Sequence, residues 1–140
     1  MRFWDSSAVV PLLVEEPASG NLRRLLRTDG EVIVWWGTPV ECGSAIARLE
    51  RDNALSLSTR NAAITRLRTL ELEWREVLPS TKVRDLAQRL LRTHTLRSAD
   101  ALQLAAALVA ADDDPAALDF VCLEERLTVA AQREGFTVAP

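Results

Sequence analysis

Hydrophobic and polar residues follow two periodic patterns along the chain, one typical of β-strands and one typical of α-helices. Short runs rich in aromatic and β-branched residues predict strands at 1–5, 31–36, 74–79, 118–123 and 136–139. Apolar residues three and four positions apart predict helices at 6–16, 18–28, 38–49, 58–72, 83–91, 98–111 and 124–134. Strands that alternate with helices favour a parallel sheet covered on both faces. We therefore expect an α/β fold, a three-layer α/β/α sandwich with a mostly parallel central sheet.

The ends of several predicted helices carry recognisable capping residues. Thr38 and Glu41, with a proline between them, have the pattern of a capping box in which threonine is the N-cap. Ser98 is the expected N-cap of the helix that follows it. Gly30 and Gly135 are expected to close the helices that precede them, because glycine readily adopts the left-handed conformation found just after a helix.

Acidic residues lie at or just after the ends of three predicted strands. Asp5 ends the first strand, Glu41 lies in the first helical turn after the second, and Glu124 follows the fourth. Asp100 begins an otherwise apolar helix, as Glu41 begins its own. The carboxyl ends of parallel strands meet at one edge of a sheet, and ligands bind there. We expect these four acids to form a shared carboxylate pocket.

Each acid also has a purely local explanation. Asp5 could cap the turn that follows it, and Glu41 could complete the capping box. Asp100 could stabilise the positive end of its helix dipole. Glu124 could do the same for its helix, and its neighbour Glu125 could serve as well as Glu124 in any site.

A cluster of four carboxylates destabilises itself unless a cation lies within it. Two like charges about 4 Å apart repel by about 1 kcal/mol in water and by about 4 kcal/mol at an effective dielectric constant of about 20. The cluster offers only oxygen ligands, which suit Mg²⁺ or Mn²⁺ and not zinc. Such an ion lowers the pKa of a bound water and stabilises charge on phosphate. Metal-assisted hydrolysis is therefore the predicted chemistry.

Other catalytic classes lack their residues in this sequence. His94 is the only histidine, which removes mechanisms that use two imidazoles, and we expect it in a loop. The chain has no G-x-S-x-G, P-loop or G-x-G-x-x-G motif, so acyl transfer and nucleotide binding are not indicated. Cys42 and Cys122 are isolated, and we expect both to be buried, reduced thiols.

Length and composition are those of an ordinary globular protein. The 140 residues fit a single domain, residues 1–140. No apolar run is long enough to cross a membrane and the N-terminus lacks the apolar core of a signal peptide, so we expect a cytoplasmic protein with no membrane partner. The formal charge of −3 argues against a broad basic surface for nucleic acid. All basic residues except Lys82 are arginine, whose fork suits phosphate, although biased genomic base composition explains this more simply.

Four segments, in a fixed order and spacing, carry a family pattern over essentially the whole chain. They are D-S-S-A-V-V at 5–10, T-P-V-E-C-G-S-A-I-A-R at 38–48, L-R-S-A-D-A-L-Q-L-A-A-A-L at 96–108 and F-V-C-L-E-E-R-L-T-V-A-A at 120–131. Through them the chain resembles the PIN-domain ribonucleases, and among these the toxins of VapBC toxin–antitoxin systems. The third segment is the most specific of the four.

The resemblance implies that Asp5, Glu41 and Asp100 are metal-binding and catalytic acids. Glu124 takes the place of a fourth acid. The family usually has Thr-x-Asp after the last long strand, where this chain has Cys-Leu-Glu at 122–124, so a hydroxyl is lost and the acid is one methylene longer. We therefore expect Glu124 to contact the metal through water.

The resemblance also implies a substrate and partners. The substrate would be RNA, cut by a water activated by Mg²⁺ or Mn²⁺. A VapB-like antitoxin would cover the pocket, and the chain would form a homodimer. Ser6 matches a small hydroxyl residue beside the first acid and is expected to contact substrate. Arg97 and Arg126 are our hypothesis for the side chains that contact RNA phosphates.

Two other functions remain open on the sequence. A PIN-like fold that binds RNA or a protein without cutting would account for the altered fourth acid. A phosphatase of the haloacid-dehalogenase type also starts with a strand-end aspartate. That family needs a second aspartate two residues later, where this chain has Ser7.

Overall fold

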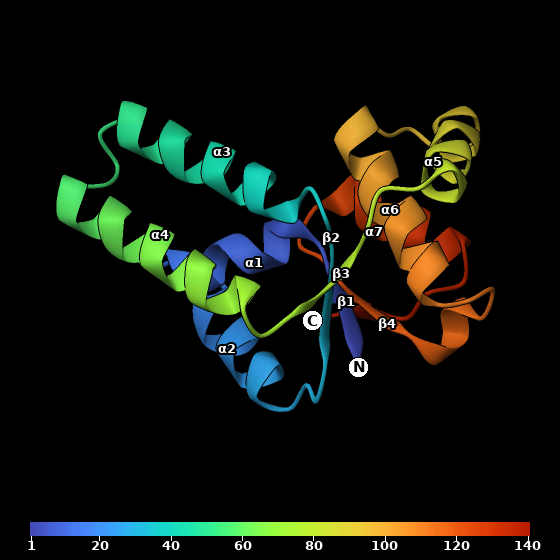
Figure 1. Cartoon of the computed structure of the whole chain (residues 1–140), viewed down its shortest axis with the longest axis horizontal. Coiled ribbons are helices and arrows are strands. Elements are labelled where there is room, and N and C mark those ends of the chain that lie inside the picture. Colours follow the sequence, from blue (N-terminus) through green and yellow to red (C-terminus); the bar gives the residue numbers. More distant parts are fainter.

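The computed structural model describes all 140 residues, and its centre is one sheet of five parallel strands (Figure 1). The strand order is β3-β2-β1-β4-β5. The strands are β1 (Arg2–Trp4), β2 (Val32–Trp35), β3 (Arg75–Val77), β4 (Asp119–Val121) and β5 (Val138–Ala139). The chain proceeds outward from β1 to β3 and then returns to place β4 on the other side of β1. The winding therefore reverses between β1 and β4, where α/β sheets open a crevice for ligands.

Helices cover both faces of the sheet, which confirms the predicted three-layer α/β/α sandwich (Figure 1). One face carries α1 (Ser6–Leu13), α2 (Ser19–Arg27), α3 (Thr38–Arg51) and α4 (Leu57–Glu71). The other carries α5 (Thr81–Thr93), α6 (Ser98–Ala110) and α7 (Glu125–Arg133), with a short 3₁₀ turn at Pro115–Ala117. None of these helices has the length and apolar character needed to cross a membrane.

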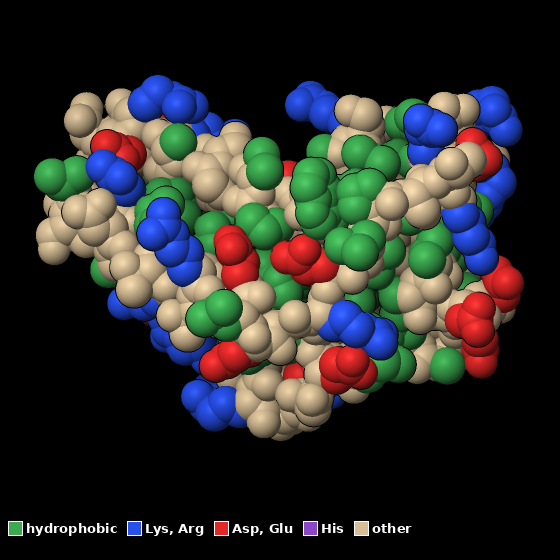
Figure 2. Space-filling model, in the orientation of Figure 1, with side chains coloured by type: hydrophobic (Ala, Val, Ile, Leu, Met, Phe, Trp, Pro, Cys, Tyr) green, Lys and Arg blue, Asp and Glu red, His purple; other side chains and the backbone are tan.

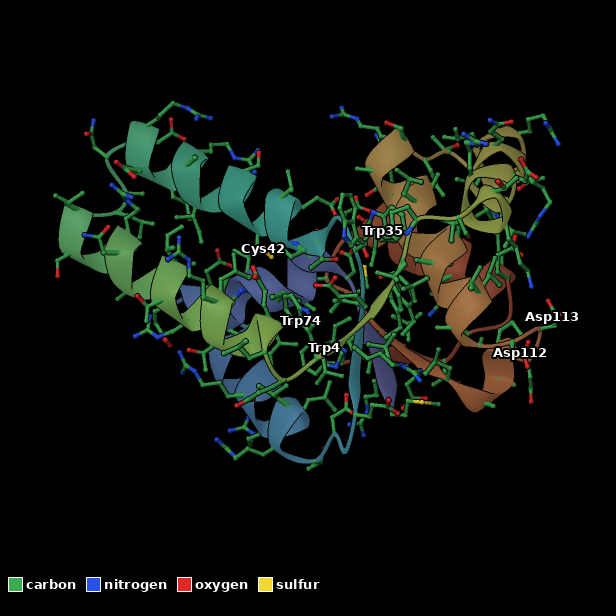
Figure 3. All side chains as sticks on the ribbon, viewed as in Figure 1. Trp4, Trp35, Cys42, Trp74, Asp112 and Asp113 are labelled. Carbon is green, nitrogen blue, oxygen red and sulfur yellow. The ribbon has the colours of Figure 1, made fainter.

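Two hydrophobic cores fill the space between the sheet and its helices. Side chains of a strand point alternately to opposite faces. Phe3 accordingly packs beneath α5–α7, where it stacks on Phe120 with ring centroids 5.5 Å apart, whereas Trp4 packs beneath α1–α4. Figure 3 shows Trp4 and Trp74 on the α1–α4 side, with Trp35 toward α6. The two cores meet at β1, so this strand is packed on both faces.

The capping box predicted at residues 38–41 is not formed. Gly37 is the N-cap of α3, so Thr38 is already helical, and it is fully buried. The Thr38 hydroxyl accepts a hydrogen bond from Nε2 of Gln103 in α6 at 3.1 Å. Thr38 and Glu41, which the local pattern assigned to the cap, instead form hydrogen bonds with Gln103 of α6.

Two further helix ends differ from the prediction, and one agrees with it. Arg97 and not Ser98 is the N-cap of α6, and it makes no capping hydrogen bond through its side chain. Helix α2 ends at Arg27, and its C-cap Thr28 donates both its hydroxyl and its N–H to the Leu25 carbonyl, so Gly30 does not close the helix. Gly135 closes α7 with φ of 103°, as predicted.

Candidate active site

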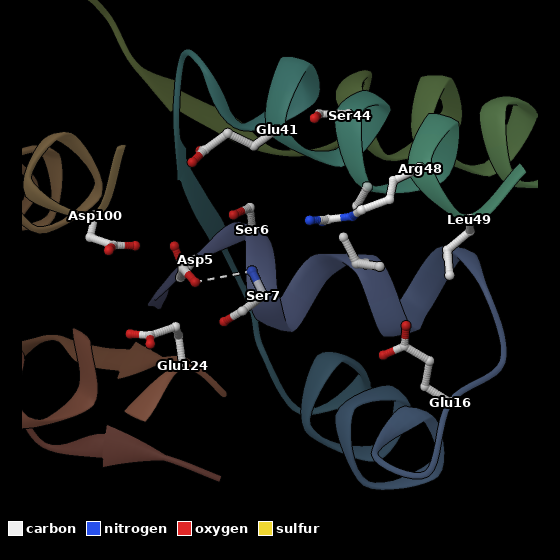
Figure 4. Close-up of a pocket in the computed structure, with 12 residues that line it drawn as sticks. Asp5, Ser6, Ser7, Glu16, Glu41, Ser44, Arg48, Leu49, Asp100 and Glu124 are labelled. Carbon is white, nitrogen blue, oxygen red and sulfur yellow. Dashed lines mark hydrogen bonds between the residues drawn. The ribbon is translucent and has the colours of Figure 1, made fainter. Parts of the chain in front are cut away.

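A hollow of about 450 Å³ opens at the carboxyl edge of the sheet. Figure 2 shows the molecule indented between α3 and α6, with basic side chains on both rims. Four acids lie around this hollow: Asp5, Glu41, Asp100 and Glu124 (Figure 4). The other lining residues are Ser6, Ser7, Val10, Glu16, Ser44, Ala45, Arg48 and Leu49. The four carboxylates predicted from the sequence therefore share one pocket.

Asp5 follows β1 directly and is the most deeply buried of the four acids, with 3% of its surface exposed. It is also the N-cap of α1, since its Oδ2 accepts the Ser7 N–H at 3.0 Å. Burial raises the pKa of the Asp5 carboxyl, the hydrogen bonds from Ser7 oppose the rise, and the charge of Asp100 adds to it. The capping role and the place in the pocket coexist.

Glu41 lies in the first turn of α3 and reaches into the pocket from the side opposite Glu124 (Figure 4). Its Oε2 accepts a hydrogen bond from Nε2 of the buried Gln103. Burial raises the pKa of the Glu41 carboxyl to about 7, and the negative charges of Asp5 and Asp100 contribute. A carboxyl with this pKa is poised between its protonated and charged forms near neutral pH.

Asp100 and Glu124 form the wall contributed by the other half of the sandwich. Burial and the charge of Glu124 raise the pKa of Asp100, while Arg97 and Arg126 oppose this rise. Glu124 is the N-cap of α7, and its Oε2 accepts the Leu127 N–H at 2.6 Å. Its neighbour Glu125 faces a different hollow, so the structure selects Glu124 as the glutamate of the pocket.

The loop after β4 is tied to the start of α1, which fixes Glu124 beside Asp5. The hydroxyl of Ser7 accepts the Leu123 N–H at 3.0 Å. Cys122 lies beneath this junction, with its Sγ 3.8 Å from Asp5 Oδ2 and 3.3 Å from the Glu124 nitrogen. Burial, with the nearby Asp5 charge, raises the pKa of the Cys122 thiol to about 12, so the thiol stays protonated at neutral pH. Both cysteines are free and buried, as predicted.

The donor set suits a hard divalent cation. All four candidate ligands are carboxylates, and three of them have raised pKa values because their charges are buried close to one another. Mg²⁺ and Mn²⁺ favour such oxygen ligands and relieve such repulsion. The side chains do not already form a closed cage, since no three Asp, Glu, His or Cys groups stand in metal-binding geometry. Mg²⁺ keeps several waters and does not need an all-protein cage.

The predicted substrate contacts are only partly in the pocket. Ser6 lines it, next to Asp5. Arg97 and Arg126 do not line it, although both lie close enough to Asp100 to oppose the rise in its pKa. His94 lies at the end of α5, outside the pocket, and its Nε2 is 2.7 Å from Glu134 Oε1. Histidine is therefore absent from the carboxylate pocket.

Two polar residues of the site were missed by the sequence analysis. Arg48 lines the pocket on the same helix as Glu41. Its signal was its position seven residues after Glu41, which places both on one face of α3. Gln103 lies within an apolar run of the sequence, and in the structure it is fully buried beneath Glu41. An amide among buried alanines and leucines is itself a signal, because a buried polar group needs partners.

Comparison with known proteins places the chain in a family. No family model matches it. The ribonuclease VapC45 of Mycobacterium tuberculosis is 31% identical over 147 aligned residues, which cover 99% of this chain and 94% of that protein. The chain belongs to the VapC ribonuclease family. The resemblance to VapC toxins seen in the sequence is thereby confirmed.

Solved structures from toxin–antitoxin systems share the fold. The crystal structure of M. tuberculosis VapC20, described as a sarcin–ricin loop cleaving toxin, superimposes with a TM-score of 0.68 at 16% identity and covers 98% of this chain and 97% of that one. A toxin–antitoxin complex from Klebsiella pneumoniae superimposes with a TM-score of 0.62 at 13% identity, over 89% of this chain and 87% of that one. At these identities the likeness is one of fold.

Proposed function

We propose that this VapC-family chain is a metal-dependent endoribonuclease and the toxin of a toxin–antitoxin pair. The observation that carries the proposal is the meeting of four carboxylates, from both halves of the sandwich, where the winding of the sheet reverses. Membership of a ribonuclease family supports RNA as the substrate, and so does the structural similarity to VapC20, a toxin that cleaves the sarcin–ricin loop.

In this proposal Asp5, Glu41 and Asp100 hold Mg²⁺ or Mn²⁺ through their carboxylate oxygens. Glu124 assists through a water, because its Oε2 is already engaged by the Leu127 N–H. When bound, the ion lowers the pKa of a water and offsets the charge that builds on the scissile phosphate. The protein fixes the acids: Ser7 orients Asp5, and Gln103 orients Glu41.

The RNA enters along the basic rims of the hollow. Ser6 is at hand to donate a hydrogen bond to a phosphate oxygen beside the acids. Arg97 and Arg126, which lie near Asp100 at the helix starts of α6 and α7, would contact phosphates on that side. An acidic protein that relies on such local arginines has no need of a broad basic surface.

The proposed partners are a cognate antitoxin and a second copy of this chain. The Klebsiella neighbour is a toxin–antitoxin complex, which supports an antitoxin that covers the carboxylate pocket. A cationic side chain of the antitoxin would offset the charge of the four acids. The homodimer is proposed from family membership alone. An RNA substrate and two free, buried thiols are in keeping with action in the cytoplasm.

A second candidate function, binding of RNA without cleavage, is favoured by one feature of the site. Glu124 replaces the usual aspartate, and its Oε2 accepts the Leu127 N–H to cap α7, so this oxygen is not free to bind a ligand. The phosphatase alternative has no such support. Ser7 occupies the position of its second aspartate, and the Ser7 hydroxyl is used to anchor the Leu123 backbone.

Cleavage of an end-labelled, structured RNA tests the proposal. The purified chain is incubated with Mg²⁺, Mn²⁺ or EDTA beside Asp5→Asn, which keeps an oxygen for the Ser7 N–H, and Glu125→Gln, a glutamate outside the pocket. We expect metal-dependent cutting by wild type and by Glu125→Gln, and none by Asp5→Asn. Cutting that survives in Asp5→Asn would show a contaminating nuclease. Tight binding of the RNA without cutting under any condition would establish the second function.

A further inference from the structure

Arg48 places a positive charge in the carboxylate pocket, on the wall formed by α3. Glu41 and Arg48 both line the pocket from α3, and Ser44 and Ala45 lie between them on the same face. Seven residues along a helix span about 10 Å. The four carboxylates gather near Ser6, and the Arg48 side chain extends from α3 toward Ser6, with Glu16 farther along the hollow (Figure 4). A ligand that extends from the four acids along α3 thus meets the positive charge of Arg48.

The Arg48 guanidinium is not neutralised by an ion pair with the acids around it. It takes part in no ion pair, although the pocket contains five acidic residues, Glu16 among them. Some arginines of the chain are paired with carboxylates, such as Arg89 with Glu134 at 3.1 Å, whereas Arg48 is not. Figure 4 shows the Arg48 side chain directed toward Ser6 and away from Glu16. The positive charge is therefore available to a ligand.

The acid cluster and the Arg48 guanidinium together suit a ligand that carries more than one phosphate. A carboxylate cluster that holds a divalent cation attracts one phosphate, and the planar fork of a guanidinium binds another through two hydrogen bonds. Ser6 lies between Asp5 and the Arg48 side chain, and Ser44 lies on α3 between Glu41 and Arg48, so both hydroxyls can offer neutral hydrogen bonds to oxygens of the strand. A single small anion would reach either the metal site or Arg48, whereas a nucleic acid strand can reach both.

We propose that Arg48 binds an RNA phosphate next to the one that is cut, and so aligns the strand along α3. The inference rests on the proposed ribonuclease function and adds to it a substrate contact and a direction for the strand. Because the contacted phosphate is not the reacting one, Arg48 is a positioning residue. It stabilises the bound substrate and the transition state to the same extent, so its loss raises KM and leaves kcat nearly unchanged.

The test compares Arg48→Gln and Arg48→Lys with Arg51→Gln, which removes the same charge from the same helix outside the pocket. Steady-state cleavage of an end-labelled RNA hairpin is measured with Mg²⁺ at several salt concentrations. For Arg48→Gln we expect KM to rise about tenfold with kcat within about twofold, the cost of one lost phosphate contact. The slope of log binding constant against log salt should fall by about 0.7, the value for one phosphate of a single strand. Arg48→Lys should recover part of the affinity, and Arg51→Gln should match wild type.

Three outcomes would overturn the assignment. If Arg48→Gln behaves like Arg51→Gln, the guanidinium does not touch the substrate. A fall in kcat at unchanged KM would place Arg48 in the chemical step. A loss of affinity for a copurified protein partner with RNA binding intact would assign the cation to that partner. Should wild type cut no RNA, the ribonuclease proposal fails separately. Fluorescence anisotropy of the same hairpin then decides on Arg48, since equal affinities of wild type and Arg48→Gln would refute it.

Discussion

Gln103 of α6 donates a hydrogen bond from its side-chain amide to Oε2 of Glu41 on α3, and this bond joins the two halves of the carboxylate pocket. The same Nε2 also donates to the Thr38 hydroxyl at 3.1 Å. Gln103 is fully buried, and its Oε1 has no partner. Leaving a buried acceptor without a hydrogen bond costs stability. The stabilising contacts of the amide are therefore those of its nitrogen, which holds the Glu41 carboxylate in place.

Gln103→Leu should impair the site far more than the fold. The substitution frees Glu41 but also removes the unpartnered Oε1, so we expect a change in unfolding free energy within about 2 kcal/mol. Loss of a group that orients a metal ligand typically costs 10-fold to about 100-fold in metal affinity or activity. Cleavage kinetics and Mn²⁺ binding by calorimetry measure the effect, with the exposed Gln132→Leu as control. Full activity in Gln103→Leu would show that Glu41 is held by other contacts.

The metal-free protein should lose stability as the pH rises toward 7, because of Glu41. Burial raises the pKa of this carboxyl from 4.5 to about 7. The folded state then binds the proton more tightly than the unfolded chain, so the stabilising contribution is complete below about pH 4.5 and disappears as the pH rises through about 7. Since the group is partly exposed, we expect a loss of about 1 to 2 kcal/mol.

Urea unfolding in EDTA across this pH range measures the contribution of Glu41. The difference between wild type and Glu41→Gln isolates it, because the glutamine does not titrate. Glu73→Gln, an exposed acid outside the pocket, serves as the matched control and should follow wild type. Parallel pH profiles for wild type and Glu41→Gln would contradict the prediction.

Mg²⁺ or Mn²⁺ should raise the melting temperature, and Asp100→Asn should abolish much of that response. Burial and the Glu124 charge raise the pKa of Asp100, which shows that its negative charge is unfavourable without a cation. Asn at this position should therefore melt higher than wild type in EDTA. A ligand stabilises the folded state by RT ln(1 + [L]/Kd), so a weakened site gains less from metal. Differential scanning fluorimetry with and without metal measures both effects.

The exposed Asp85→Asn on α5 is the control for this experiment. It carries the same change of charge and should respond to metal as wild type does. If Asp100→Asn melts lower than wild type in EDTA and keeps the full metal response, Asp100 serves only the start of α6.

Glu134 should matter for stability and not for cutting. It accepts two hydrogen bonds from Arg89, each 3.1 Å, and lies 2.7 Å from His94. Burial alone would raise the pKa of the Glu134 carboxyl, but the bonds from Arg89 and His94 outweigh it and lower the pKa. The stabilising contribution is thus present above the ordinary pKa of 4.5 and is lost as the pH falls below it.

Glu134→Gln should accordingly lower the unfolding free energy at pH 7 by about 1 kcal/mol. The cost should vanish at pH values below the folded-state pKa, where wild type is protonated too. Because Glu134 does not line the carboxylate pocket, kcat should stay at the wild-type value at a temperature where both proteins are folded. A selective loss of kcat in Glu134→Gln would show that the pair of His94 and Glu134 contributes to catalysis.

The sequence by itself determined the layers of the fold and the identity of the four acids. Strand and helix patterns follow from local backbone geometry, with periods of about 2 and 3.6 residues that are visible in the sequence. Parallel strands then bring their carboxyl ends to one edge, so Asp5, Glu41 and Glu124 could be placed together without coordinates. The place of Asp100 was predicted from a different feature, its position as the one acid at the start of an apolar helix.

Only the tertiary structure decided how those acids are held and what else joins them. The hydroxyl of Thr38, assigned to a cap by local pattern, is bonded to Gln103, which is 65 residues away in the chain. The Ser7 hydroxyl bonds the Leu123 backbone across 116 residues. Polar groups take the best partner available in three dimensions, and a local pattern contains only the near ones. For the same reason the place of Arg48 in the pocket, free of any ion pair, appeared only when α3 was packed against α1.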